Sequence, residues 1–213
     1  MKKIVILGCL ILFLVPPIWA QEKAEAPVWK VGDRWAYKSD SGIEMTMECI
    51  GDEKDLFVLN RNVSQGSRKG KWTLYFDKKD MTCVKVTKDG KENKEERDRT
   101  KKGFNFPLFP GRQWTYSSSF YNPAYNMNHD VLTEYSVIGV EDVEVPAGKF
   151  RAFKVMVKIT MTELSPPQRQ FSGAYYYWWA PDARAIIKYE TDRSTFFQRA
   201  DFQRYELISF NLK

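Results

Sequence analysis

The chain of 213 residues is long enough for about one domain, and 15% of its residues are aromatic. It carries 33 basic against 27 acidic groups, a net charge of +6 that no segment concentrates into a basic stretch. This mild, dispersed charge argues against a nucleic-acid-binding protein.

The first twenty residues have the layout of a secretory signal. Lys2 and Lys3 precede an apolar run from Ile4 to Val15, and Ala20 supplies the small residue of a cleavage site. The run of about 12 residues is shorter than the roughly 20 that a membrane-spanning helix needs. We therefore predict cleavage after Ala20 and a soluble mature domain of residues 21–213, located in the periplasm or secreted.

The cysteines leave two questions open. Cys9 ends a stretch with the shape of a lipidation signal, Ile-Leu-Gly-Cys, but the apolar run continues beyond it. We therefore interpret Cys9 as one more apolar member of the signal. Cys49 and Cys83 remain in the mature chain, and an exported pair can either form a disulfide or stay as two buried thiols.

Short runs of alternating apolar and polar residues, bounded by turn residues, recur from end to end and predict strands. The clearest runs are 44–50, 56–59, 72–76, 81–86, 131–140, 150–162, 174–180, 185–190 and 205–212. No amphipathic helix interrupts them. The pattern predicts about ten or eleven strands in an all-β, antiparallel domain.

One segment stands apart in composition. Residues 88–103 contain seven bases and five acids and no large apolar side chain, so they cannot contribute to a core. We expect a solvated charged loop or a short exposed helix.

This charged segment separates two halves that begin alike. Residues 32–37 and residues 111–116 both follow the pattern G-x-x-W-x-Y. A glycine suits a turn, and Trp and Tyr two positions apart point to the same side of the strand that follows. We expect two similar strands within one continuous β structure.

The sequence carries no catalytic signature. His129 is the sole histidine and is followed by Asp130, but no serine or cysteine has the context of a nucleophile, and its turn-like neighbours favour a surface loop. One histidine and two separated cysteines also fall short of a zinc site. The acids of residues 141–144 are explained by a solvated strand face. We therefore expect no enzyme, no cofactor and no metal.

The segment from Ala174 to Ala180 contains five consecutive aromatic residues. In a strand, Tyr175, Tyr177 and Trp179 point to one face and Tyr176 and Trp178 to the other. Each aromatic side chain can bury about 150 to 250 Å², so three on one face present an apolar surface that must be covered. One face can lie on the protein core, which leaves the other for a second sheet, a loop, a partner or a ligand.

Several of these motifs together resemble a known family. They are Val31-Gly32-Asp33 with Trp35 and Tyr37, Phe106-Pro107-Leu108 with Gly111, Trp114 and Tyr116, Val143 to Phe150 with the sequence VEVPAGKF, Tyr177 to Pro181, and Ile187 to Glu190. The family consists of exported bacterial envelope proteins, is catalogued as a domain of unknown function, and is similar in fold to the periplasmic lipoprotein carriers. The resemblance covers about residues 28 to 212. It implies a single antiparallel sheet curled into a half-open barrel with an apolar concave face, and it supplies no catalytic residues.

The leading hypothesis is a non-catalytic binding module for an apolar ligand or lipid, since open barrels commonly hold such sites. The candidate ligand-binding residues are Trp35, Trp114, Tyr175, Tyr177 and Trp179. The alternative is an interaction or assembly factor of the envelope that offers an aromatic patch or a sheet edge to a protein partner. Bases on the predicted strands, including Lys154 and Lys188, disfavour a membrane-spanning barrel.

Overall fold

The computed structural model describes residues 22–93, 104–122, 126–192 and 203–213. The predicted signal peptide and its cleavage site therefore lie outside the described residues. Within them, no helix has the length and apolar character needed to cross a membrane.

The described residues form strands, in agreement with the predicted all-β class. The strands are β1 (Arg34–Ser39), β2 (Glu44–Glu53), β3 (Leu56–Gln65), β4 (Arg68–Asp77), β5 (Cys83–Lys88), β6 (Lys91–Glu92), β7 (Gln113–Asn122), β8 (Met127–Val145), β9 (Gly148–Glu163), β10 (Gln170–Ala180), β11 (Ala185–Thr191) and β12 (Arg204–Asn211).

The predicted count of ten or eleven strands was wrong, because these strands number twelve. The strand that the prediction omitted is β6, which lies in the charged segment. Asp89 and Gly90 take φ values of 52° and 77°, the two positive φ angles of a tight hairpin turn between β5 and β6. The start of this segment is therefore a hairpin rather than a loop or helix, and the rest of it, residues 94–103, lies outside the described residues.

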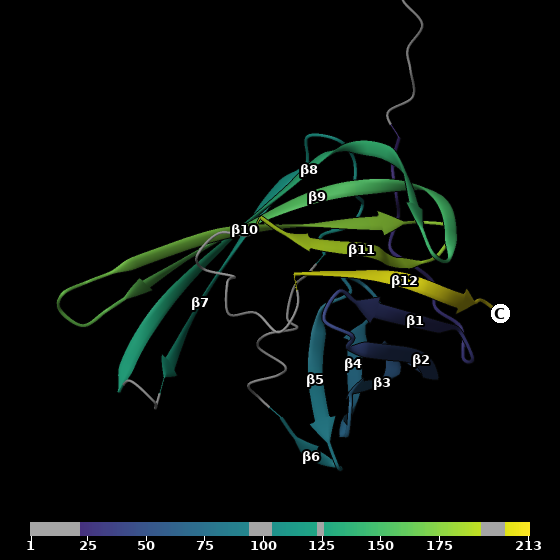
Figure 1. Cartoon of the computed structure of the whole chain (residues 1–213), viewed down its shortest axis with the longest axis horizontal. Helices are drawn as coiled ribbons and strands as arrows, with labels where there is room; N and C mark the ends of the chain where they lie inside the picture. The colour runs from purple at the N-terminus through teal and green to yellow at the C-terminus, as the bar shows by residue number, and fades with distance from the viewer. Residues whose placement is uncertain (1–21, 94–103, 123–125, 193–202) are drawn as a thin grey trace, which may run out of the picture.

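All twelve strands belong to one antiparallel sheet that is not closed. Its order is β6-β5-β4-β3-β2-β1-β12-β11-β10-β9-β8-β7, so β6 and β7 are the two edges. The sheet consists of two meanders, β1–β6 and β7–β12, joined where β1 pairs with β12. Figure 1 shows the first meander folded beneath the strands of the second.

The two G-x-x-W-x-Y segments adopt the same turn, as their sequences predicted. Gly32 and Gly111 both take a left-handed φ, 95° and 87°, which glycine adopts without the penalty of a Cβ atom. The N–H of Gly32 donates to the carbonyl of Cys49 on β2, the strand that pairs with β1. The N–H of Gly111 donates to the carbonyl of Val137 on β8, the strand that pairs with β7. The turns therefore place β1 and β7 in the same way at the start of each meander.

Two apolar clusters hold the curled sheet together. The larger one lies between the first meander and the strands beside it, and includes Trp35, Leu59, Phe76 and Leu207. The smaller one lies on β8, β9 and β10 and includes Trp179. Beyond the clusters the outer ends of β7 to β10 project away from the rest of the molecule (Figure 1).

Cys49 and Cys83 form no disulfide, and both are fully buried. Cys49 lies on β2 and Cys83 on β5, with β3 and β4 between them. Three strand spacings amount to about 14 Å along the sheet, whereas a disulfide requires Cα atoms within about 7 Å. The open question is thus answered in favour of two buried thiols, which contribute to the larger apolar cluster.

Candidate functional site: an aromatic cavity inside the curled sheet

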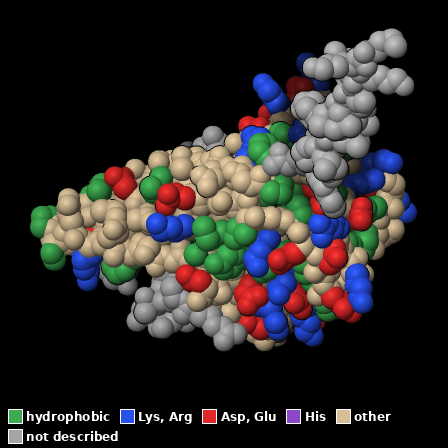
Figure 2. Space-filling view, turned by 90° about the horizontal axis from the view of Figure 1, so that it is seen from above, with side chains coloured by type: hydrophobic (Ala, Val, Ile, Leu, Met, Phe, Trp, Pro, Cys, Tyr) green, Lys and Arg blue, Asp and Glu red, His purple; other side chains and the backbone are tan. Residues whose placement is uncertain are grey.

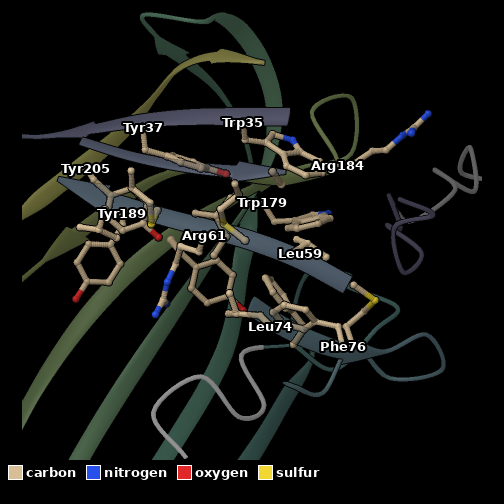
Figure 3. A pocket seen from close by; sticks show the side chains of 18 of the residues that line it. Trp35, Tyr37, Leu59, Arg61, Leu74, Phe76, Trp179, Arg184, Tyr189 and Tyr205 are labelled. Carbon is tan, nitrogen blue, oxygen red and sulfur yellow. The ribbon is translucent and has the colours of Figure 1, made fainter. Parts of the chain in front are cut away.

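The curl of the sheet encloses a cavity of about 680 Å³. Its walls come from β1 to β4 of the first meander and from β10, β11 and β12 of the second (Figure 3). Because each strand sends every second side chain to this concave face, the walls are continuous across the seam between the two meanders. The volume lies within the range of about 300 to 1,000 Å³ that is typical of small-molecule sites.

One end of the cavity is closed by apolar side chains. Trp29, which precedes β1, packs edge-on against Trp35 and Phe76 with ring centroids 5.9 and 5.4 Å apart. Its indole N–H donates to the carbonyl of Arg184, and this hydrogen bond fixes the ring across the end of the sheet. Met81 and Leu74 complete this floor, and both are almost fully buried.

The opposite end is partly open and more polar. The side chains there lie at matching levels of neighbouring strands, since Ser39 pairs with Tyr205 and Tyr205 with Tyr189. Each of these three residues is only partly buried. The rings of Tyr189 and Tyr205 stack with centroids 5.0 Å apart, and Tyr175 lies 5.0 Å from Tyr189. The cavity thus runs from an apolar floor to a rim of hydroxyl groups.

Five tyrosines line the cavity, and the pKa of each is raised. Burial is the main cause for all of them, because it disfavours the phenolate anion. The five are Tyr37, Tyr175, Tyr177, Tyr189 and Tyr205. They are therefore neutral at physiological pH and act as hydroxyl donors and acceptors, not as anions or bases.

Two arginines also line the cavity, in different surroundings. Arg184, near the closed end, donates to the carboxylate of the fully buried Asp33 at 3.0 Å. Arg61, in the middle of β3, lies with its guanidinium 4.9 Å above the ring of Trp72. It is close enough to Tyr205 to lower the pKa of that hydroxyl, against the larger effect of burial (Figure 3). None of the described residues that line the cavity is Asp or Glu.

Four of the five residues predicted from sequence lie together on this cavity. Trp35, Tyr175, Tyr177 and Trp179 all contribute to its walls. Trp114 does not: on the edge strand β7 it stacks on Tyr135 with centroids 4.8 Å apart, outside the described lining. The two equivalent tryptophans of the G-x-x-W-x-Y segments therefore differ in position, because β1 lies in the middle of the sheet and β7 at its edge.

The second face of the aromatic strand is covered by protein. Trp178 is buried on the convex side, and its indole N–H donates to Glu141 of β8 at 2.6 Å. This hydrogen bond, together with Lys154, lowers the pKa of Glu141. Lys154 and Lys188 lie 5.0 and 4.8 Å from the ring of Trp178, a cation–π arrangement. Glu141, Lys154 and Lys188 thus cover Trp178 on one face of β10, while the aromatic residues of the other face line the cavity.

Sequence reasoning missed the walls that the first meander provides. Met45, Met47, Leu59, Arg61 and Trp72 all line the cavity. All but Arg61, which lies beyond the predicted run 56–59, occupy inward positions of a predicted strand, so the alternation of the strand could have indicated them. What the pattern could not indicate is that β2, β3 and β4 curl to face β10.

The residues considered for catalysis lie elsewhere. His129 was predicted in a surface loop, and this was wrong: it lies on β8, is 4% exposed, and stacks on Phe120. Asp142 and Glu144 are solvent-exposed on β8, as expected of a solvated strand face. Within the described part of the chain, no three His, Cys, Asp or Glu side chains gather where they could hold a metal ion.

The fold has relatives among solved structures. A putative lipoprotein from Parabacteroides distasonis is similar over 90% of this chain and 100% of its own, with a TM-score of 0.54 and 16% identity. A putative exported protein with a YmcC-like fold from Bacteroides fragilis covers 88% of this chain and 99% of its own at a TM-score of 0.43 and 15% identity. The hypothetical lipoprotein YmcC of Escherichia coli covers 87% of this chain and 90% of its own, at a TM-score of 0.37 and 11% identity.

No family model and no curated protein matches the chain. At these identities the first structural similarity bears on the fold alone. The resemblance to exported bacterial proteins of unknown function, drawn above from sequence motifs, is confirmed at that level.

Proposed function

We propose that this protein is an exported, non-catalytic binding protein that holds an apolar ligand in a half-open barrel. The observation that carries the proposal is the cavity of about 680 Å³ with walls of aromatic and aliphatic side chains. A sheet whose concave face served only as a core would fill this space with its own side chains, since protein interiors are close-packed. The space is instead continuous from the rim to the Trp29 floor.

Apolar burial would supply the binding energy. A ligand that enters the cavity removes its own apolar surface and that of the walls from water, at about 25 cal/mol for each Å². The walls are already in place in the free protein, held by paired strands, so little ordering opposes binding. The aromatic rings offer flat surfaces against which a chain-like or ring-like apolar molecule packs.

The test is binding by the mature chain of residues 21–213. We expect native mass spectrometry of the gently purified protein to detect a bound lipid, and a fluorescent fatty acid to bind with saturation. Met47, on β2, lines the middle of the cavity and is half-buried. Met47→Trp should fill that space and weaken binding of the probe by at least about tenfold, whereas the volume-conserving control Met47→Leu should keep it.

The proposal would be overturned by a wild-type protein that retains no lipid and binds no probe. Equal binding by Met47→Trp and Met47→Leu would show that the probe sits elsewhere. Circular dichroism of both variants separates loss of the site from loss of the fold.

A second candidate function is an envelope interaction or assembly factor, and the projecting ends of β7 to β10 favour it. Apolar side chains are exposed there, namely Phe120, Tyr121, Leu132, Leu164 and Phe171. Figure 2 shows hydrophobic side chains at the far end of this projection. Cross-linking in the native envelope discriminates between the functions, because an assembly factor gives a stable protein adduct through these residues and a carrier does not.

A further inference from the structure

The two edges of the sheet differ in how well they are protected against further pairing. An edge strand presents backbone N–H and C=O groups to any strand that approaches, and proteins usually protect it by shortness, charged side chains or proline. The edge strand β6 consists of Lys91 and Glu92 alone, both charged and exposed. The other edge, β7, has ten residues, and its sequence QWTYSSSFYN contains no charged residue and no proline. Among the described residues, no strand pairs with its outer side.

The hydrogen bonds to β8 determine which residues of β7 face outward. The N–H of Val137 donates to the carbonyl of Arg112, just before β7 begins. From there the register between β7 and β8 continues without a shift. Opposite residues of an antiparallel pair alternate between those that exchange hydrogen bonds and those that do not, so every second residue of β7 points its backbone groups away from β8. These residues are Gln113, Thr115, Ser117, Ser119 and Tyr121.

The outward residues are arranged symmetrically about Ser117, the central one. Two copies of β7 that run antiparallel around a twofold axis at this residue would place Ser117 opposite Ser117 and Thr115 opposite Ser119. Gln113 would lie opposite Tyr121. All five outward residues of each copy would then exchange backbone hydrogen bonds with the other copy, about ten bonds in total. No like charges would face each other, because the strand has none.

The aromatic side chains of β7 fit the same register. Trp114 and Phe120 lie three residues on either side of Ser117, on one face of the strand. Each stacks on the residue opposite it in β8, Trp114 on Tyr135 and Phe120 on His129, with ring centroids 4.8 and 5.0 Å apart. Trp114 of one protomer would lie directly opposite Phe120 of its partner. Phe120, which is 44% exposed, would thus be covered by a cross-strand aromatic pair, a stabilising contact in sheets.

We infer that the protein forms a symmetric dimer in which the β7 strands of two copies pair antiparallel about Ser117, so that one sheet continues through both. A second copy fits this edge because a single strand supplies both members of each backbone and aromatic pair, the requirement of a twofold contact. Figure 1 shows β7 along one margin of the projecting strands. The inference is independent of the cavity, whose described lining contains no residue of β7.

The first experiment measures the mass of the mature chain, residues 21–213, in solution. We expect light scattering after size exclusion to give the mass of two chains. Ser117→Lys places two like charges directly opposite each other and should raise the dissociation constant of the dimer by at least about tenfold. Ser67→Lys makes the same change in the exposed turn between β3 and β4 and should leave the dimer intact.

Mixing two variants tests the register. Ser117→Lys and Ser117→Asp should each be monomeric alone, and an equimolar mixture should restore the dimer, because opposite charges then face each other across the axis. A mixture that stays monomeric would contradict the placement of Ser117 on the axis.

Cross-linking through an introduced thiol gives an independent measurement. Ser117→Cys should oxidise to a covalent dimer, because Cα atoms of residues that exchange hydrogen bonds lie about 5.5 Å apart, within the range of a disulfide. Ser119→Cys is the control, since four residues separate it from its counterpart along the strands, about 14 Å. Cys49 and Cys83 are fully buried and do not compete.

The outcomes separate this inference from the binding function. A wild-type chain that is monomeric up to its limit of solubility, a dimer that Ser117→Lys leaves intact, or equal cross-linking of Ser117→Cys and Ser119→Cys would overturn the β7 dimer. Cross-linking of Ser117→Cys to a different envelope protein in place of a second copy would also overturn it. Ser117→Lys should bind the fluorescent fatty acid as the wild type does. If circular dichroism shows that Ser117→Lys does not fold, the cross-linking decides.

Discussion

Asp33 ties three parts of the chain together from a fully buried position. Its carboxylate accepts hydrogen bonds from the backbone N–H groups of Lys30 and Lys213, at 2.9 and 2.7 Å, and from the guanidinium of Arg184 at 3.0 Å. The contacts join the turn before β1, the end of the chain after β12 and the turn between β10 and β11. The same carboxylate therefore supports the closed end of the cavity.

Replacing this carboxylate should be costly. In Asp33→Ala the two backbone N–H groups and Arg184 lose their acceptor inside the fold, and we expect the free energy of unfolding to fall by about 3 kcal/mol. The control is Asp142→Ala, which removes an 83%-exposed side chain paired with Arg151 and should cost less than about 0.5 kcal/mol. Urea denaturation of both variants measures the difference. Similar small losses for both would contradict the anchoring role.

Individual side chains show where sequence reasoning succeeds and fails. Tyr175, Tyr177 and Trp179 were assigned to one face from strand alternation alone, and the structure places them on the cavity. Trp114 has the same local sequence as Trp35 but sits on an edge strand away from the described lining. Local pattern determines the face of a strand, whereas its place in the sheet depends on pairing between distant segments.

At the scale of elements, the repeated turn is the clearest case of local sequence dictating structure. Gly111 takes a φ of 87°, and an added Cβ atom would meet no atom within 4 Å. The only cost of a side chain there is conformational. At Gly32 an added Cβ would lie 3.3 Å from the side chain of Lys213. This side chain is flexible, so the cost of a substitution at Gly32 combines the conformational cost with a small shift of Lys213.

Substitution of the turn glycine isolates this conformational cost. Gly111→Ala should lower the free energy of unfolding by about 1 to 2 kcal/mol, because an L-residue is strained at positive φ. Gly139→Ala is the matched control: it also has open space around the new Cβ, but its φ is not in the left-handed region. We expect Gly139→Ala to be neutral or slightly stabilising. Thermal melts followed by circular dichroism compare the two, and an equal loss in both would contradict the role of φ.

The strand ends were harder to predict than the strands. The apolar alternation indicated a strand over 131–140, but β8 runs from Met127 to Val145. Its first residues include Asn128, His129 and Asp130, which have turn-forming propensity and yet pair with β7 and β9. Cross-strand pairing overrides weak local preference here. The two-residue strand β6 was not predicted because its segment is rich in charged residues. Asp89-Gly90 is nevertheless a typical turn sequence of a hairpin.

For the whole molecule, the buried tyrosines predict its behaviour at high pH. Burial raises the pKa of Tyr135 to about 12, and the pKa of each of the five cavity tyrosines is also raised. The unfolded chain ionises its tyrosines near pH 10, so above this pH the folded state binds more protons than the unfolded state. Stability is therefore fully present below pH 10 and is lost as the pH rises beyond it.

The expected slope is about 1.4 kcal/mol per pH unit for each such tyrosine, in the window from pH 10 to about 12 for Tyr135. Urea denaturation at a series of pH values measures it, with the absorbance of tyrosinate as an independent readout. If these six tyrosines ionise near pH 10 in the folded protein, with no loss of stability, the burial of Tyr135 and of the five cavity tyrosines would be contradicted.

The overall architecture could be predicted only in outline. Alternation and turn residues indicated an antiparallel all-β domain, the two G-x-x-W-x-Y segments indicated two similar strands within it, and the single curled sheet was implied by the family resemblance alone. The cavity required knowledge of the curl, because Met47 and Arg61 of the first meander become cavity walls only when they face β10 and β12. Curl depends on sheet twist and on bulges such as those in β2 and β8, whose positions no short-range pattern specified.

The pairing of β1 with β12 also determines the order in which the molecule can assemble. Every other neighbour in the sheet follows its partner directly along the chain, so each meander can form from local hairpins. The β1–β12 pair joins Arg34 to Asn211, and closing so long a loop is the slowest kind of contact. The cavity therefore takes shape only after the last strand has been delivered. For the exported chain proposed here, this delay keeps the ligand site unformed until β12 has been exported.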